Sequence, residues 1–148
     1  MSSIQVGCHL VDQVLEFVLA VKAAHREINR RFSEALRPLG ITVVQAEAIL
    51  ILADDQPLTL GELGTRLIAE TGNPSRLADR LQAAGLIHRQ PSPHDRRNIE
   101  LTLTPYGREM ATRIQQARQP LLDWGRTLLN DSQFAAATVA LHRVRDQS

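Results

Sequence analysis

The residues best suited to binding chemistry lie close together in the stretch QPSPHDRRNIELTLTPYG, residues 90–107 of this 148-residue chain. Two prolines there introduce a short polar run: Pro91, Pro93, His94, Asp95, Arg96 and Arg97. Apolar and polar residues then alternate, which is typical of a β-strand. Arginine side chains bind anions, and prolines reduce the freedom of a loop before binding. The stretch therefore predicts a stiff, basic loop at the tip of a strand pair.

The middle of the chain is basic although the whole chain has a formal net charge of only +1. Of the 17 basic residues, 16 are arginines. Six arginines fall between residues 66 and 97, against three acidic residues: Arg66, Arg76, Arg80, Arg89, Arg96 and Arg97 against Glu70, Asp79 and Asp95. A local excess of positive charge favours a local anionic partner over a generally cationic protein.

Length and composition predict one domain with a substantial core, since 43% of the residues are hydrophobic. The single cysteine, Cys8, excludes an intramolecular disulfide and a cysteine-rich zinc site. The apolar stretch VLEFVLAV near the N-terminus contains Glu16 and has no Lys or Arg before it, so it does not resemble an export signal. No stretch approaches the roughly 20 apolar residues of a membrane span. We therefore expect a cytoplasmic protein.

Helical spacing of apolar residues predicts one long helix from Leu10 to Leu36, ended by RPLG at 37–40. Further helix starts are indicated by polar residues suited to capping. Thr42 with Gln45 and Thr59 with Glu62 have the spacing of a capping box. The next helix follows the turn TGN, where Asn73 can cap, Pro74 suits the first helical position and Gly85 suits the left-handed position after the end.

The period then changes from helical to two. LIHRQ and NIELTL are predicted to form antiparallel strands that flank the loop 91–97. Thr104 with Pro105 should start another helix, Pro120 should kink or end it, and Asp131 should cap a last helix. The predicted fold is mainly α with a small antiparallel β wing, in a single domain covering residues 1–148.

Two short helices followed by a hairpin predict a winged helix-turn-helix. On its second helix, Leu77, Leu81 and Ala84 share one face and should point to the core. Polar residues should then face outward: Ser75, Arg76, Asp79 and Gln82. Such a helix fits the DNA major groove, where Arg bonds to guanine. We take Asn73, Ser75, Arg76 and Asp79 as candidate DNA contacts; the alternative is an ordinary solvated helix face.

The basic loop adds to this hypothesis. Arginine at the tip of a narrow β-loop can enter the minor groove, where the negative potential is strongest. We expect Arg97 to be the inserted residue, Arg96 to contact phosphate, and Asp95 to brace the Arg97 guanidinium. The alternative is a charged, mobile surface loop.

The stretch SRLADRLQAAGLIHRQPSPHDRRNIELTLTPYG resembles the recognition helix and wing of the MarR family of bacterial transcription regulators. Asp95 and Arg97 match its Asp-x-Arg wing pattern, and Leu103, Thr104 and Gly107 match the following LTxxG. The resemblance implies a DNA-binding lobe at about 42–104 and dimerisation helices at about 8–37 and 105–146. It also implies a homodimer, often a repressor, on a pseudo-palindromic operator. Apolar stripes at both chain ends independently need a covering partner.

Members of this family often release DNA when a small aromatic anion or phenol binds, so the resemblance also implies an effector pocket. His25 lies on the apolar stripe of the first helix and is a candidate ligand contact, with Arg26 and Trp124 as further candidates. A core or interface histidine is the alternative for His25. Cys8 leaves open a redox-responsive regulator, against an inert thiol.

Other function classes have less support. The five histidines are scattered without an i, i+4 pair, so we expect no metal site and no cofactor. No Gly-rich phosphate loop, HExxH or GxSxG motif occurs, so we do not expect an enzyme. A winged-helix protein-interaction module remains the alternative to a DNA-binding regulator, and in that case the Arg-rich wing would be dispensable.

Overall fold

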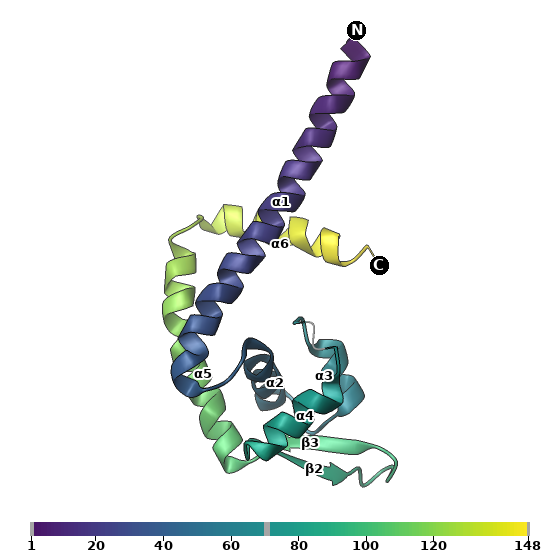
Figure 1. Cartoon of the computed structure of the whole chain (residues 1–148), viewed down its shortest axis with the longest axis vertical. Helices are drawn as coiled ribbons and strands as arrows, with labels where there is room; N and C mark the ends of the chain where they lie inside the picture. Colours follow the sequence, from purple (N-terminus) through teal and green to yellow (C-terminus); the bar gives the residue numbers. More distant parts are fainter. Residues whose placement is uncertain (1, 70–71, 148) are drawn as a thin grey trace.

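The computed structural model describes residues 2–69 and 72–147, and within the first helix it describes side chains from residue 12 onward. Figure 1 shows the arrangement of the elements, which follow one another as α1 (Ser2–Leu36), η1 (Arg37–Leu39), α2 (Val43–Asp54), β1 (Leu58–Thr59), α3 (Leu60–Arg66), α4 (Pro74–Ala83), β2 (Ile87–Pro91), β3 (Ile99–Leu103), α5 (Pro105–Arg126) and α6 (Asp131–Arg145). The protein is mainly helical with one small antiparallel sheet, so the predicted fold class is confirmed.

The caps of α2 and α4 lie where the sequence predicts them. The Thr42 hydroxyl accepts a hydrogen bond from the Gln45 N–H, and the Gln45 side chain accepts one from the Thr42 N–H, which completes a capping box. Asn73 caps α4, Pro74 is its first residue, and Gly85 follows its end with a φ of 75°. The predicted turn TGN begins at Thr71, which lies outside the described residues.

The C-terminal half differs from the expectations at two points. Of the two outcomes predicted for Pro120, a kink or an end of the helix, the end does not occur, because α5 continues to Arg126. A proline inside a helix removes one backbone donor and crowds the carbonyl four residues before it, but the hydrogen bonds of the other turns can still hold the helix together. The last helix is capped by Asn130 and not by Asp131, because Asn130 has Gln133 three residues on and forms a reciprocal capping box. Asp131 instead becomes the first helical residue, where its charge suits the positive end of the helix.

The sheet has three strands in the order β1-β3-β2. The predicted pairing of β2 with β3 is confirmed, with Ile87 opposite Leu103 and Arg89 opposite Leu101. The short strand β1 pairs with the other edge of β3 and has no counterpart in the sequence prediction, because two residues are too few to form an alternating pattern. The wing is therefore joined on its inner edge to the segment that leads into α3.

One core lies between the sheet and the helices. Its fully buried side chains come from every layer: Leu36, Ile49, Leu52, Leu63, Leu81, Leu86, Ile87, Leu101 and Ile114. On α4 the predicted inward residues Leu77 and Leu81 are buried, but Ala84 is exposed and Ala78 is buried instead. Ala84 keeps helical dihedrals but is the C-cap residue, at the end of α4, whereas Ala78 lies in the middle of the helix.

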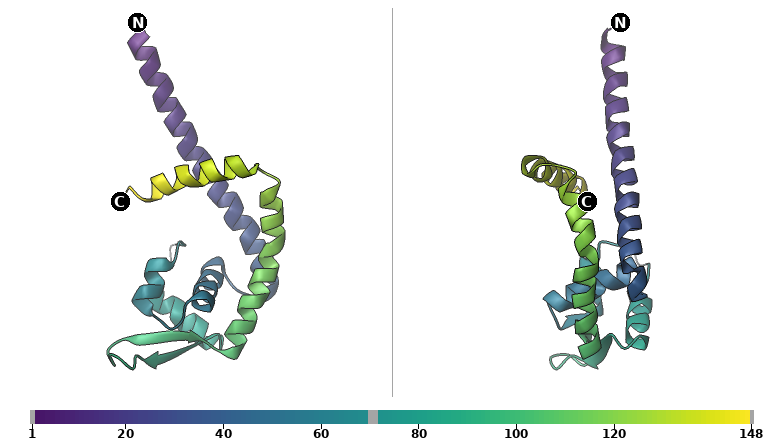
Figure 2. Two further views of the ribbon diagram at one scale, coloured as in Figure 1. Left: turned by 180° about the vertical axis from the view of Figure 1, so that it is seen from behind. Right: turned by 90° about the vertical axis from the view of Figure 1, so that its left-hand side faces the viewer.

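Two helices extend from this lobe. Figure 1 shows that α1 runs far beyond it to the N-terminus, while α5 passes alongside and leads to α6. In Figure 1 α6 crosses α1, but the side view in Figure 2 separates the two helices. Helices α1 and α6 carry exposed apolar side chains. These are Val14, Leu15, Phe17, Val18, Leu19 and Ile28 on α1, and Val139, Leu141 and Val144 on α6.

Among the described residues no single helix is long and apolar enough to cross a membrane, and only the bent pair Asp12–Leu39 with Val43–Asp54 meets the length and composition requirements jointly.

Candidate nucleic-acid interface and adjoining pocket

The start of α4 is organised by Asn73. Its side-chain oxygen accepts hydrogen bonds from the backbone N–H groups of Ser75 (3.0 Å) and Arg76 (3.4 Å). This cap uses donors that a phosphate could otherwise engage at the helix start. Asn73 therefore has a structural role at the position where the sequence predicted a DNA contact.

The outer face of α4 carries the predicted polar residues. Ser75, Arg76, Asp79 and Gln82 are all exposed, as their spacing predicts. The Arg76 guanidinium has no hydrogen-bond or ion-pair partner among the described residues, so it is available to a ligand. Exposure of these side chains is established, whereas their contact with DNA remains a prediction.

Asp79 lies on the same face but is already paired. Its carboxylate forms an ion pair with the Arg89 guanidinium of β2, with 2.8 Å between the charged atoms. Arg89 also donates a hydrogen bond to the Ser75 carbonyl at 3.2 Å. Arg89 is 27% exposed, which makes this the least solvated basic partner among the ion pairs of the described chain. It thereby fixes α4 onto the wing sheet, a role that sequence reasoning missed because the two residues belong to different elements.

The wing loop is shaped by hydrogen bonds of its own. The Asp95 carboxylate accepts from the Arg97 backbone N–H at 3.0 Å, and the Asn98 N–H donates to the Asp95 carbonyl at 3.0 Å. At the base of the loop the Ser92 N–H donates to the Asn98 carbonyl at 2.8 Å. These contacts form an Asx turn closed by a short backbone pairing.

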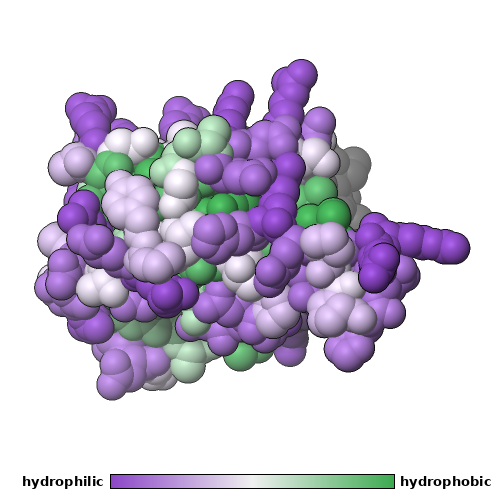
Figure 3. Space-filling model, turned by 90° about the horizontal axis from the view of Figure 1, so that it is seen from below, coloured by the Kyte–Doolittle hydropathy of each residue, from purple (hydrophilic) through white to green (hydrophobic). Residues whose placement is uncertain are grey.

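The predicted contact between Asp95 and the Arg97 guanidinium is not formed; Asp95 holds the Arg97 backbone instead. An aspartate two residues before an amide has the reach to accept from that N–H, which is the geometry of an Asx turn. The guanidinium groups of Arg96 and Arg97 have no partner in the described part of the chain, and both side chains are exposed. Seen from below, this end of the molecule is mostly hydrophilic, with several side chains projecting outward (Figure 3).

The motif LTxxG connects the wing to α5. The Thr104 hydroxyl accepts from the Gly107 N–H and donates to the Gly85 carbonyl at 2.6 Å. A Cβ on Gly107 would lie 2.1 Å from the Leu86 carbonyl oxygen, closer than any side chain permits. Glycine is therefore required where α5 approaches the turn between α4 and β2.

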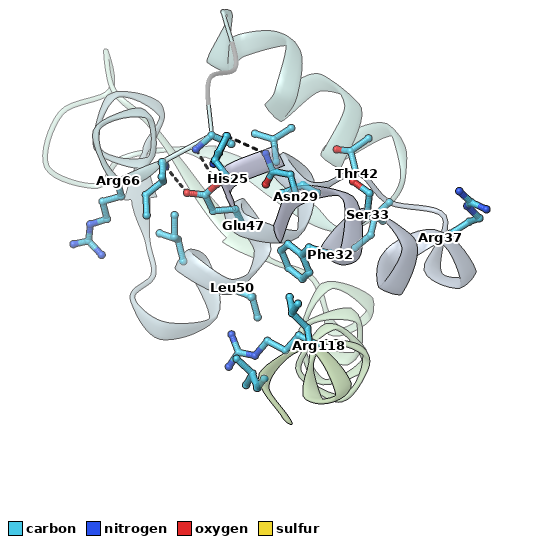
Figure 4. A pocket seen from close by; sticks show the side chains of 18 of the residues that line it. His25, Asn29, Phe32, Ser33, Arg37, Thr42, Glu47, Leu50, Arg66 and Arg118 are labelled. Atoms are coloured by element: carbon cyan, nitrogen blue, oxygen red, sulfur yellow. Dashed lines mark hydrogen bonds between the residues drawn. The ribbon is translucent and has the colours of Figure 1, made fainter. Parts of the chain in front are cut away.

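An open pocket of about 1440 Å³ lies between the long helices and the lobe (Figure 4). Helix α1 contributes polar and aromatic side chains, α2 contributes mainly apolar ones, and α5 closes the far side with Arg118. The charged side chains that line it are Arg37, Arg66 and Arg118 together with Glu47 and Asp54. Arg66 is paired with Asp55, whereas Arg118 has no ion-pair partner in the described chain. An apolar wall beside the Arg118 guanidinium suits a ligand with an apolar body and a negative charge.

Of the predicted ligand residues, only His25 is found among those lining the pocket. Its Nε2 lies 3.1 Å from Asn29 Nδ2. Arg26 is exposed and does not belong to the described lining. Trp124 lies against Arg31, whose guanidinium carbon is 3.9 Å from the ring centroid. The side chain of Cys8 in α1 lies outside the described ones.

Sequence reasoning missed Arg118, Glu47 and Arg66 as pocket residues. Arg118 follows Ile114 by four residues and precedes Leu121 by three, so it lies on the inward stripe of α5. A charge on an apolar stripe is a signal that could have identified it. Glu47 and Arg66 carried no comparable signal. In the described residues no group of three His, Cys, Asp or Glu side chains is arranged to hold a metal.

Comparison with known proteins points to one family. The sequence profile of the MarR family matches residues 39–98, which contain the helix-turn-helix and most of the wing. Over this segment the chain is similar to the MarR family. It is 32% identical over 85 residues to the organic hydroperoxide resistance transcriptional regulator of Bacillus subtilis (strain 168), a match covering 57% of this chain and 58% of that protein. This relative is a transcription regulator by name, in agreement with the expectation that the chain is not an enzyme.

Two solved structures have the same architecture as this chain over most of their length. The transcriptional repressor CouR bound to a 23-mer DNA duplex is 27% identical, with a TM-score of 0.77, and the match covers 85% of this chain and 89% of CouR. Bordetella bronchiseptica BpsR, studied for the regulation of its DNA binding by 6-hydroxynicotinic acid, is 20% identical with a TM-score of 0.79, and the match covers 87% and 92% of the two chains. The latter likeness supports the fold alone.

Proposed function

We propose that this protein regulates transcription by binding a pseudo-palindromic operator, with α4 in the major groove and the wing loop 92–98 in the minor groove. The carrying observation is that Arg76, Arg96 and Arg97 are exposed cations without a partner in the described chain. Hydrogen bonds within the loop and the Asp79–Arg89 pair reduce the freedom of the elements that present them. Preorganised cations suit a phosphate backbone and the edges of its grooves.

We propose a homodimer as the operator-binding form. The exposed apolar side chains of α1 and α6 lie outside the core of the lobe and favour burial against a second copy. A two-fold dimer would present two α4 helices to half-sites about one DNA turn, roughly 34 Å, apart. DNA occupancy by such a dimer near a promoter would act as repression, and we expect the protein to be cytoplasmic.

We propose that the pocket takes a small aromatic or phenolic anion that weakens operator binding. Arg118 is half-buried and lines the pocket without an ion-pair partner in the described chain, and apolar side chains such as Phe32 and Leu50 line the other walls. BpsR is a fold relative whose DNA binding responds to 6-hydroxynicotinic acid. Arg118 and His25 are the polar contacts that we expect for the ligand.

Fluorescence anisotropy with the full chain and DNA flanking its own gene tests the proposal. Each neutralised phosphate releases counterions, so the log–log plot of affinity against salt should fall with a slope of about −0.9 per contact. A scrambled duplex of equal length is the control for specificity. Binding that does not depend on salt, or equal affinity for both duplexes, would exclude specific DNA recognition and favour a protein-interaction module.

The redox alternative is tested in the same assay. Cys8 is the only cysteine, so a Cys8→Ser variant removes all thiol chemistry from the chain. We expect organic hydroperoxide to leave the operator affinity of both proteins unchanged. A peroxide response in the wild type that Cys8→Ser abolishes would establish Cys8 as a sensor and replace the aromatic effector in this proposal.

A further inference from the structure

Glu47 of α2 holds the chain at the point where it leaves α3. Its carboxylate accepts hydrogen bonds from the backbone N–H groups of two consecutive residues, Ile68 and Ala69, with 3.1 Å between the Ala69 nitrogen and Oε2. Figure 4 draws both bonds as dashed lines that converge on Glu47. These residues lie on the path from α3 to the recognition helix α4. One side chain of α2 thus fixes the connection inside the helix-turn-helix.

Apolar packing contributes little to this part of the connection. Ile68 is 89% exposed, so its side chain does not anchor the backbone. Leu67, one residue earlier, is half-buried and packs against the core. Hydrogen bonds to an ionised carboxylate are roughly twice as strong as those between neutral groups. The two bonds to Glu47 are therefore the main interaction at residues 68 and 69 in the described structure.

A second contact joins the same two helices near the pocket. Arg66, the last residue of α3, forms an ion pair with Asp55 just after α2, with 2.6 Å between the charged atoms. Glu47 and Arg66 both line the pocket. The Arg66 guanidinium points away from the pocket in Figure 4, so an anion in the pocket would act mainly by repelling the Glu47 carboxylate. This repulsion acts on the connection from α3 to α4.

We propose that Glu47 is a positioning residue that holds the α3–α4 connection in the DNA-binding arrangement, and that an aromatic anion in the pocket acts on DNA affinity by weakening this contact. The second part rests on the proposed function, because it needs operator binding and an anionic effector. The first part is a property of the folded chain and is measurable without either.

Amide hydrogen exchange on the full-length protein tests the positioning role. Glu47→Ala removes both acceptors, whereas Glu47→Gln keeps one acceptor oxygen and the side-chain volume but loses the charge. A hydrogen bond to a charged group changes an equilibrium constant by roughly ten- to a hundredfold. The protection of the Ile68 and Ala69 amides against exchange should therefore fall by about tenfold or more in Glu47→Ala. It should fall by less in Glu47→Gln.

Glu62→Gln is the matched control. It removes the same charge from the same lobe but keeps an oxygen for the Thr59 hydroxyl, which contacts Glu62 at 3.1 Å. Amide exchange at Ile68 and Ala69 should be unchanged in this variant. Operator affinity should fall only in the Glu47 variants, more in Glu47→Ala than in Glu47→Gln. Equal exchange at both amides in wild type and Glu47→Ala, with both folded by circular dichroism, would overturn the positioning role.

Benzoate is the probe for coupling, with benzamide as a neutral molecule of the same shape. Benzoate should weaken operator binding by the wild type, and the ratio of the two dissociation constants, with and without benzoate, should move toward one in Glu47→Gln. The same ratio in wild type and variant would overturn the coupling through Glu47. A wild type that binds its operator but does not respond to benzoate contradicts the proposed effector class, and amide exchange still decides the positioning role.

Discussion

Single atoms decide where glycine is required in this chain. Gly107 has no room for a Cβ because the Leu86 carbonyl oxygen lies 2.1 Å from that position, whereas a Cβ on Gly125 of the same helix meets nothing within 4 Å. Gly107→Ala should destabilise the protein by about 1–3 kcal/mol through overpacking. Gly125→Ala should stabilise it by up to about 1 kcal/mol, because alanine favours the helix. Urea unfolding at one protein concentration measures both, and a neutral Gly107→Ala would contradict the close approach.

At the wing, the contact of Asp95 with the Arg97 backbone changes what its mutation should reveal. Asp95→Ala removes the acceptor for the Arg97 N–H and should weaken operator binding despite the gain of positive charge. Asp95→Asn keeps an oxygen that can accept the same hydrogen bond in the turn. This variant should bind the operator at least as tightly as wild type, because it lacks the negative charge that repels the DNA phosphates. Anisotropy titrations compare the three proteins. Weak binding by Asp95→Asn would mean that the charge of Asp95, and not its turn, supports DNA binding.

The two basic elements should respond differently to loss of an arginine. Arg97→Ala should weaken binding to most sequences, because the wing is proposed to contact groove and backbone. Arg76→Ala should cost about 1–3 kcal/mol at the operator and relax the preference at one base position. Binding to a set of single-substitution operators measures this. An unchanged affinity for Arg97→Ala would remove the wing from the proposed mechanism.

At the scale of elements, α1 is joined to α5 by a chain of charges that ends on an aromatic ring. Glu27 forms ion pairs with Arg30 and Arg31, and Arg31 lies over Trp124. Hydrogen bonding from Arg30, aided by Arg31, lowers the pKa of Glu27 to about 2. Because the folded pKa is depressed below the ordinary 4.5, the stabilisation is present above pH 4.5 and is lost as the pH falls toward 2.

Trp124 is the only tryptophan and reports on this contact. Its fluorescence in the wild type should change as the pH falls through about 2, where Glu27 takes up a proton and no longer holds Arg31. In Glu27→Gln the change should already be present at pH 7, since the amide cannot form the ion pairs. Identical fluorescence titrations of the two proteins would show that Glu27 does not control the position of Arg31.

At the scale of the whole molecule, the exposed stripe on α1 predicts an obligate dimer. Val18→Glu should produce monomers or unfolded chains in sedimentation velocity at micromolar concentration, since it puts a charge into the proposed interface. Ala23→Glu introduces the same charge about 140° away around the helix and should leave the dimer intact. A wild-type protein that sediments as a stable, folded monomer would refute the dimer and, with it, the paired operator half-sites.

The sequence by itself determined the features that depend on residues three or four apart. The caps at Thr42, Asn73 and Thr104, the left-handed Gly85 and the strand pair of the wing all lie where local patterns predict them. Each uses a side chain and a backbone group within one turn of each other, or a short alternating run. The outward direction of Ser75, Arg76 and Asp79 follows from the same local geometry. For these features the chain needs no distant partner.

The tertiary structure decided the features whose partners are distant in sequence. The Ile68 amide lies 21 residues after Glu47, and the glycine requirement at Gly107 depends on the Leu86 carbonyl. Arg89 could not be distinguished from the other arginines until β2 was packed against α4 and brought it to Asp79. Long-range contacts of this kind depend on how the elements pack, which periodicity within one element does not specify. They decided which charges remain free for a ligand and which hold the fold together.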